Sequence, residues 1–176
     1  MSGGRAAPPD AASAKMQFPA IRSARPGEIV LTADGLRFGW SRRAAPLLTD
    51  LSFTVRQGES VVLLGENGAG KTTLLSLVMG LRRFTSGIIH TCGRPVHRTR
   101  PDRLAGRAGF LFQHPDHQLY LARVKDEVFM QAADSSTAAR ELAELDLEGL
   151  TERHPRSLSM GQKRRLTIAA ALARQP

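Results

Sequence analysis

Apolar positions follow two different spacings along the chain after residue 27. The segments 28–40 and 47–55 are rich in β-branched and large apolar residues and are joined by a polar turn, so they predict two neighbouring strands. The run SVVLLG at 60–65 is continuously apolar and closes with a glycine, which is typical of a strand buried on both faces. The run AGFLFQ at 108–113 has the same character and predicts another buried strand.

Helical spacing appears in other segments. Residues 71–81 (KTTLLSLVMGL) follow a glycine-rich loop, and residues 136–145 (STAARELAEL) are amphipathic, with Leu142 and Leu145 on the apolar side. The stretch 86–96 predicts a short strand pair. The order of a β-rich start, a strand–loop–helix core and a helical insertion predicts an α/β fold.

The first residues of the chain differ from the rest in composition. Residues 1–25 are rich in Ala, Pro, Ser and Arg without periodicity, and they lack the apolar core of a secretory signal. We expect a disordered extension over 1–27, with Met16 as an alternative start. No run approaches the roughly 18 apolar residues of a transmembrane helix, so we expect any membrane spans to come from partners.

The distribution of charge along the chain indicates one candidate binding surface. The net charge is +9, and the segment 82–107 holds seven arginines against one acid, Asp102. Such a patch can bind nucleic acid, phosphate or anionic lipid, but its arginines are not interleaved with the run of aromatics that single-strand binders use. We therefore interpret it, and the basic triplet at 163–165, as solvated surface. Cys92 is the only cysteine, which excludes an internal disulfide.

The stretch GENGAGKT at 65–72 matches the phosphate-loop pattern G-x-x-x-x-G-K-[ST] and lies between the apolar run and a helical segment, as the pattern requires. Its glycines let the loop N–H groups converge on an anion beside the positive end of the following helix. Lys71 is expected to reach the β- and γ-phosphates, Thr72 to ligate Mg²⁺ and Thr73 to hydrogen-bond a phosphate. The loop residues predicted to bind nucleotide are Gly65, Asn67, Gly68, Gly70, Lys71, Thr72 and Thr73.

Two single residues become candidate nucleotide-binding residues only in combination with this loop. Trp40 ends the segment LRFGW and offers a ring that can stack on adenine, although a lone tryptophan is more simply explained as core packing. Gln113 closes GFLFQ, and its amide oxygen can complete a Mg²⁺ shell or orient a water, although glutamines are common at strand ends.

The stretch LSMGQKRRL at 158–166 is a second candidate phosphate site. Ser159 offers a hydroxyl, and Gly161 allows close backbone approach at the start of a helix. One chain needs a single γ-phosphate site, so a second one makes sense if it faces the nucleotide of another subunit.

In this order, LRFGW, GENGAGKTT, FLFQ and LSMGQKRRLTIAAALA resemble the ATP-binding cassette (ABC) family, the ATPase subunits of ABC transporters. The resemblance covers about residues 28–176. It implies a P-loop NTPase fold with an antiparallel β subdomain and an α-helical subdomain at 114–160.

The resemblance also implies roles for residues outside the phosphate loop. Trp40 would stack on adenine, and Gln113 would be the catalytic Q-loop residue and, with Thr72, a Mg²⁺ ligand. The signature residues would contact ATP held by a second ABC ATPase subunit in a head-to-tail dimer. These are Ser159, Gly161 and Gln162.

A narrower likeness lies in FQHPDHQLYLARVKDEV at 112–128, which is similar to the segment after the Q-loop in energy-coupling-factor importers of vitamins and transition-metal ions. It implies coupling of ATP binding and hydrolysis to import of a metal ion or vitamin. The subunit would act at the cytoplasmic face of the membrane through a transmembrane partner, without nucleic acid. The residues that carry the likeness are Pro115, Asp116, Gln118, Leu119, Val124 and Val128.

Two features depart from the family pattern. Met160 stands where glycine is usual, and its side chain would either crowd the partner's phosphate or point away. No acid follows Glu152, although in the family a strand after the signature helix ends in an aspartate and a glutamate. We therefore expect a truncated chain that binds Mg-ATP but turns it over poorly, with an unpaired apolar edge at 60–65. A non-transport ABC protein and an ATP-binding regulatory module without hydrolysis are the alternatives.

Overall fold

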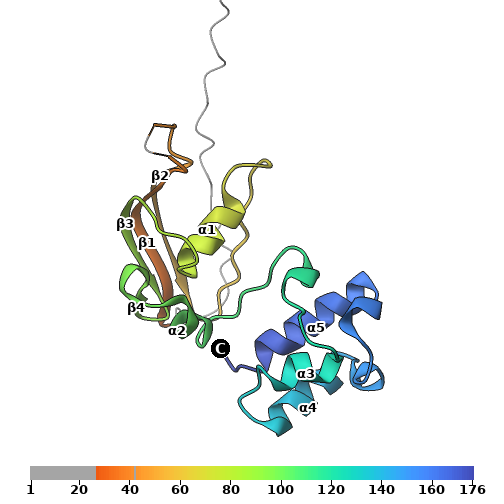
Figure 1. Cartoon of the computed structure of the whole chain (residues 1–176). Helices are drawn as coiled ribbons and strands as arrows, with labels where there is room; N and C mark the ends of the chain where they lie inside the picture. The colour runs from red at the N-terminus through yellow and green to blue at the C-terminus, as the bar shows by residue number, and fades with distance from the viewer. Residues whose placement is uncertain (1–26, 42) are drawn as a thin grey trace, which may run out of the picture.

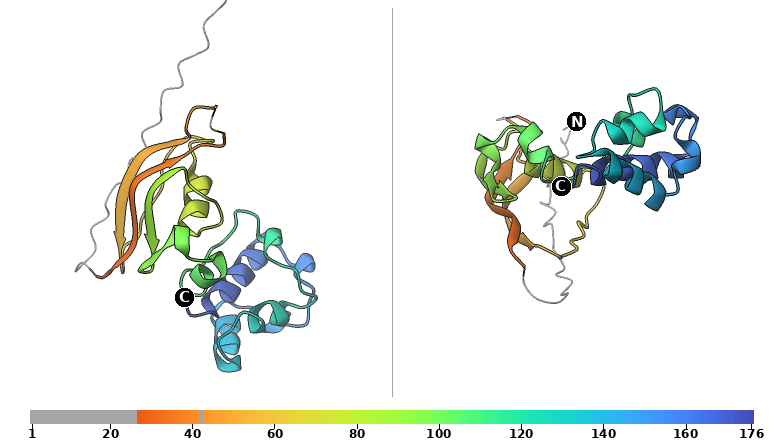
Figure 2. Two further views of the ribbon diagram at one scale, coloured as in Figure 1. Left: turned by 60° about the vertical axis from the view of Figure 1, so that its left-hand side comes forward. Right: turned by 90° about the horizontal axis from the view of Figure 1, so that it is seen from below.

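The computed structural model describes residues 27–41 and 43–176 (Figure 1). An antiparallel sheet with helix α1 against one face forms one part of the molecule, and a group of helices forms the other (Figures 1 and 2). Except for Gly27, the disordered extension expected over 1–27 lies outside the described residues. None of the described helices is long and apolar enough to cross a membrane.

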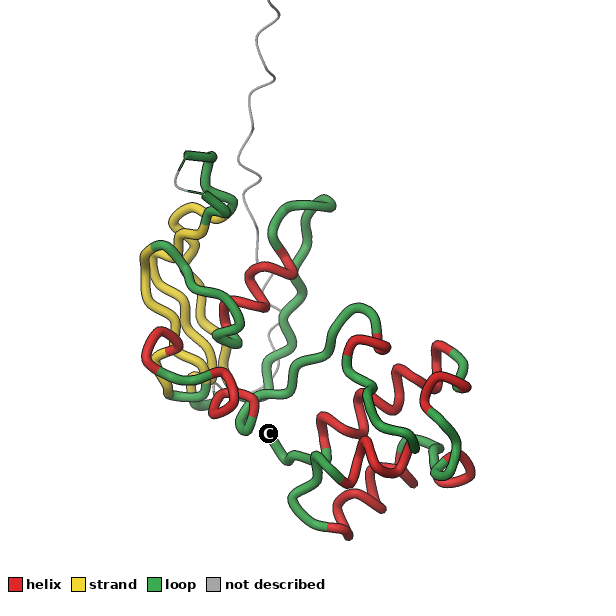
Figure 3. The backbone as a smooth tube through the Cα atoms, viewed as in Figure 1, coloured by secondary structure: helices red, strands yellow, loops and turns green. Residues whose placement is uncertain are grey.

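The sheet (yellow in Figure 3) is antiparallel throughout, and its strands have the spatial order β2-β1-β3-β4. Thr32 of β1 pairs with Thr54 on one side and with His90 on the other, so β1 is a central strand. The predicted strands at 28–40 and 47–55 and the short pair at 86–96 are confirmed. The strands are β1 (Ile29–Phe38), β2 (Leu48–Arg56), β3 (Ser86–Thr91) and β4 (Arg94–Pro95).

Helix α1 (Lys71–Val78) packs on the sheet through Leu74, Leu77 and Val78, which share one face at helical spacing. The Thr91 hydroxyl donates a buried hydrogen bond of 2.6 Å to the Val78 carbonyl, which ties the end of α1 to β3. The largest fully buried side chains of this core are Leu36, Leu74, Leu77, Ile89 and Leu104.

The second part of the molecule has its own apolar core among three helices. Small buried residues such as Ala138, Ala169 and Ala173 let these helices approach closely. Asp134 caps the second of them by accepting a 2.7 Å hydrogen bond from the Thr137 N–H. The three helices are α3 (Val124–Phe129), α4 (Ser135–Glu144) and α5 (Met160–Leu172), which confirms the amphipathic helix predicted at 136–145.

Short helical elements complete the chain. They are η1 (Val96–Arg98), α2 (Pro101–Ala105), η2 (Pro115–His117), η3 (Glu148–Leu150) and η4 (Pro155–Ser157).

The two buried strands predicted at 60–65 and 108–113 are wrong. Neither segment is a strand, and several of their apolar side chains are exposed: Leu64 is 59% exposed and Phe112 is 42% exposed. Others pack partly against the core under α1, namely Leu63, Ala108 and Phe110. A strand buried on both faces needs a hydrogen-bonded neighbour, and within the described residues the only sheet is the antiparallel one, which includes neither segment. The unpaired apolar edge expected at 60–65 is not seen as such, because the segment does not form a strand at all.

The core beneath α1 leads to a stability prediction. Leu77→Ala should lower the free energy of unfolding by about 2–5 kcal/mol, because the side chain is fully buried against the sheet. Leu75→Ala makes the same chemical change in the same helix at a side chain that is 45% exposed, and it should cost less than about 1 kcal/mol. Urea unfolding of both variants measures the difference, and equal losses would contradict the packing described here.

Candidate functional site

The glycine-rich loop enters α1 through a left-handed turn. Gly68 and Gly70 have φ angles of 89° and 92°, a region that side chains with a Cβ rarely adopt. A Cβ at Gly70 would also lie 3.1 Å from Leu48 Cδ2 and 3.2 Å from Leu47 Cγ. The loop therefore packs directly against the start of β2, and the sequence needs glycine at position 70 for both reasons.

The first turn of α1 presents backbone donors to this loop. Helical bonding begins with the Leu74 N–H, which donates to the Gly70 carbonyl at 2.8 Å. The N–H groups of Lys71, Thr72 and Thr73 therefore have no acceptor within the helix. These donors and the positive end of the helix dipole favour an anion at this position.

Lys71 adds a full positive charge to the same place. Its Nζ donates to the carbonyls of Gly65 and Glu66, both at 2.7 Å, so the ammonium lies across the loop that it follows in sequence. Such carbonyl contacts are exchangeable for charge-assisted hydrogen bonds to phosphate, which are stronger. The loop thus holds the lysine ammonium on its own carbonyls, at the start of α1.

Thr72 at the loop and Gln113 in the segment before η2 are the neutral oxygen donors predicted for a magnesium ion that arrives with phosphate, and no hydrogen bond joins these two described residues. Thr72 is exposed at the first turn of α1, and its carbonyl, not its hydroxyl, accepts the 2.8 Å hydrogen bond from Ser76. Gln113 is also exposed. Among the described residues, no group of three or more His, Cys, Asp or Glu side chains could hold a metal. Since Mg²⁺ keeps water and phosphate oxygens in most of its shell, one or two such protein donors suffice.

Trp40 is a surface ring beside the loop. It is 63% exposed, and it stands edge-to-face with Phe38, with ring centroids 5.2 Å apart. The Leu47 N–H donates to the Phe38 carbonyl at 2.8 Å, so Trp40 lies on the same hairpin end that contacts Gly70. The structure therefore brings Trp40 and the phosphate loop to one region. The exposure argues against core packing as the role of the ring.

Gln118 fixes the segment that carries Gln113. Its amide oxygen accepts from the Phe112 N–H and its amide nitrogen donates to the Phe110 carbonyl, both at 2.9 Å. Sequence reasoning noted Gln118 only through the family likeness and missed this clamp, which depends on the path of the backbone. A cavity of about 220 Å³ lies beside the segment, and its lining includes Met79, Phe110, Leu119, Glu127, Thr167 and Ala170.

The start of α5 is closed by a capping box. The Ser159 hydroxyl oxygen accepts from the Gln162 N–H at 3.3 Å, and the Gln162 side chain accepts from the Ser159 N–H at 2.9 Å. Sequence reasoning missed this box, although the S-x-x-Q spacing signals it. Gly161 adjoins the cap and is exposed, and Met160 is 60% exposed.

An ion pair joins the segment after Gln113 to α5. Lys163 Nζ lies 2.7 Å from Asp116 Oδ1, and only 13% of the lysine side chain is exposed. The hydrogen bond from Lys163, reinforced by its charge, holds the pKa of Asp116 below its usual value. The pair connects two motifs that lie 47 residues apart in sequence.

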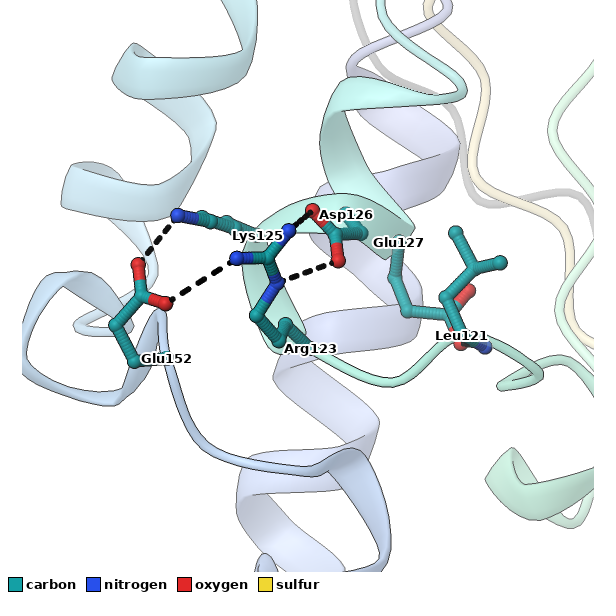
Figure 4. Close-up of polar contacts among 6 residues, drawn as sticks. All are labelled: Leu121, Arg123, Lys125, Asp126, Glu127 and Glu152. Atoms are coloured by element: carbon teal, nitrogen blue, oxygen red, sulfur yellow. Dashed lines mark hydrogen bonds and ion pairs between the residues drawn. The ribbon is translucent and has the colours of Figure 1, made fainter.

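A second ionic group fixes the helical part (Figure 4). Arg123 pairs with Asp126 at 2.8 Å and with Glu152 at 3.6 Å, and Lys125 also pairs with Glu152. The hydrogen bond from Lys125 lowers the pKa of Glu152. On the other side of α3, buried Glu127 accepts a 2.6 Å hydrogen bond from the Leu121 N–H. These contacts position α3 and the loop before α5 and serve as scaffold.

The candidate residues form two separate groups. The loop residues lie at the start of α1, with Trp40 on the hairpin whose other side contacts Gly70, whereas Ser159, Gly161 and Gln162 lie at the start of α5. Gln113 lies in the segment fixed by Gln118 and makes no hydrogen bond to either of these described groups. The first turns of α1 and α5 are well apart in Figure 1. One chain therefore does not close both groups around one ligand.

The comparisons with known proteins agree on one family. The family model described as ABC transporter matches residues 48–176. The putative HMP/thiamine import ATP-binding protein YkoD of Bacillus subtilis is 38% identical over 155 residues, which cover 86% of this chain and 28% of that protein. The energy-coupling factor transporter ATP-binding protein EcfA1 of Levilactobacillus brevis is 33% identical over 157 residues, covering 85% of this chain and 56% of that protein.

A solved structure has the same fold. The cbiO1 protein of Clostridium perfringens, described as part of the ABC transporter complex cbiONQ, superimposes with a TM-score of 0.70 at 26% identity. The match covers 85% of this chain and 63% of that one. It supports the predicted P-loop NTPase fold with an antiparallel sheet and a helical part. The chain spans about a quarter to somewhat over half of the two sequence relatives.

Because of the Asp116–Lys163 pair, the folded protein should lose stability at acid pH. Because the folded protein lowers the pKa of Asp116, the pair stabilises the fold above the unfolded pKa of about 3.9, and this contribution is lost as pH falls through the folded pKa. Asp116→Asn should therefore destabilise the protein at neutral pH and make little difference at the lowest pH. Carboxyl carbon NMR should give a midpoint for Asp116 below 3.8. A midpoint at or above that value would contradict the pairing.

Proposed function

Because this chain belongs to the ABC transporter family, we propose that it is the ATP-binding part of a membrane transporter, where ATP binding and hydrolysis drive transport. The observation that carries the proposal is the position of Lys71. Its ammonium lies across the glycine-rich loop, at the start of a helix whose first N–H groups lack helical acceptors. This arrangement recognises a polyphosphate by charge and by backbone hydrogen bonds.

The residues around the loop supply the remaining contacts of the proposed site. Trp40 offers its exposed ring to the base, and Thr73 donates to a phosphate. Thr72 and Gln113 would hold Mg²⁺, whose positive charge stabilises the negative charge on the transferring phosphoryl group. Gln113 would in addition position the attacking water. Gln118 supports that role because it fixes the backbone on which Gln113 lies.

The start of α5 is proposed to face ATP held by a second ABC ATPase subunit. Its separation from α1 within one chain supports this reading (Figure 1). The capping box sets the backbone at Ser159 and Gln162, so that the hydroxyl and the exposed Gly161 backbone lie at the surface. Met160, which is 60% exposed, lies in the same turn, and its side chain would either crowd the partner's phosphate or point away from it. Either an identical or a different ATPase subunit can supply the opposing site.

The segment 113–128 is proposed to pass the closure of the dimer to a transmembrane subunit. It is tied to α5 by the Asp116–Lys163 pair, so a movement of the α5 start is transmitted to it mechanically. The subunit would then lie on the cytoplasmic face of the membrane through that partner. The names of the relatives, a thiamine import protein and an energy-coupling factor protein, support import of a vitamin or metal ion.

Lys71→Ala tests the proposal. Removing the charged donor should weaken ATP binding by about 10- to 100-fold, since a hydrogen bond to a charged group contributes about 1.5–3 kcal/mol. Lys125→Ala removes the same charge from the ion pairs of the helical part and should leave ATP binding unchanged. Titration with a fluorescent ATP analogue measures both.

Unchanged ATP binding in the Lys71 variant would reject the proposed site. Measurable ATP turnover after the acidic residues that follow the signature helix in the family are restored would count against the ATP-binding regulatory module, whereas tight binding still without turnover would favour it.

A further inference from the structure

Arg82 covers one face of the Trp40 ring. The guanidinium carbon lies 4.7 Å from the ring centroid, although the two residues come from different segments, the end of the β1 hairpin and the loop after α1. Flat groups that stack on an aromatic ring occupy this same shell, with centres about 4.5–7 Å away. The face under Arg82 therefore cannot hold a nucleotide base at the same time.

The backbone of the loop after α1 holds Arg82 in this position. The Leu81 N–H donates to the Ser76 carbonyl at 2.9 Å, and the Thr85 N–H donates to the Arg37 carbonyl at 2.9 Å. These two bonds fix both ends of the short loop, one to α1 and one to β1. Arg82 lies between them, so its side chain starts close to the hairpin that carries Trp40.

The electrostatic surroundings of Arg82 also favour its position over the Trp40 ring. Within 27–41 and 43–176, no carboxylate forms an ion pair with Arg82. Arg82 also lines a cavity of about 550 Å³ whose lining contains no acid. Like charges there repel the guanidinium, whereas the electron-rich face of tryptophan attracts it. The basic residues of that lining are Arg82, Arg83, His97, Arg98 and Arg100.

We propose that Arg82 is a displaceable cover on the base-stacking face of Trp40, so that a purine nucleotide must move it aside in order to bind. This inference rests on the proposed function, because it assigns a cost to base binding at the same site. The triphosphate part reaches the loop at Lys71 without disturbing Arg82. The cover thus reduces the advantage of a complete nucleotide over free polyphosphate.

Arg82→Gln and Arg83→Gln test this with a matched loss of charge. Arg83 is the next residue and lines the same cavity, but no cation–aromatic contact to Trp40 is found for it. Affinities for ATP and for inorganic triphosphate are measured on the wild type and both variants. The ratio of the two affinities cancels the general effect of the lost charge. Arg82→Gln should raise the preference for ATP over triphosphate by about two- to fivefold, the factor expected from an exposed cation–aromatic contact. Arg83→Gln should leave it unchanged.

The contact itself has a readout that needs no ligand. Trp40 is the only tryptophan, so fluorescence excited at the indole reports on that ring alone. Arg82→Gln should change the emission of the ligand-free protein, and Arg83→Gln should not. An unchanged emission in the Arg82 variant would show that the guanidinium does not rest on the ring and would overturn the proposal.

The outcomes separate the two proposals. If Lys71→Ala abolishes ATP binding while Arg82→Gln leaves the ATP preference unchanged or lowers it, the cover is rejected and the ATP site stands. If neither the wild type nor any variant binds ATP, both proposals are rejected. A raised preference that appears equally in the Arg83 variant would also reject the cover, since it would come from charge alone.

Discussion

The turn of the backbone at Gly70, where the loop becomes helix α1, is the constraint on which the rest of the site depends. This residue holds a left-handed conformation with Leu47 and Leu48 in close contact, so the loop, the helix and the start of β2 meet at one point. The same turn frees the first N–H groups of α1 and sends Lys71 back across the loop carbonyls. This one local backbone conformation brings together the Lys71 charge, the free N–H donors of α1 and the hairpin that carries Trp40. The core under Leu77 keeps α1 in place.

The second half of the site is built by contacts that span longer distances in the chain. Gln118 holds the backbone before Gln113, and the Asp116–Lys163 pair ties that region to α5. The capping box at Ser159 fixes the first turn of α5. The molecule thus has two prepared helix starts, and the Asp116–Lys163 pair ties the segment after Gln113 to the second of them. This arrangement is consistent with the proposal that the start of α5 faces a nucleotide held by a second subunit.

Local patterns in the sequence predicted much of this. The strands β1 and β2, the amphipathic helix α4 and the phosphate loop depend on neighbours within a few residues, and the loop pattern already named Lys71. The segments 60–65 and 108–113 were wrongly predicted as strands because a strand also needs a hydrogen-bonded neighbour, which an apolar run cannot specify. The Gln118 clamp, the Asp116–Lys163 pair and Arg82 on Trp40 depend on how distant segments meet. The Ser159–Gln162 box is local and was recognisable from its spacing.

The central claim is that the loop at the start of α1 receives the phosphates of ATP. Amide NMR during titration of Mg-ATP into the isotopically labelled chain tests it most directly. The account predicts that the largest shifts occur at the N–H groups of Gly68, Gly70, Lys71 and Thr72. Largest shifts in the arginine-rich segment 82–107, with the loop signals unmoved, would contradict it.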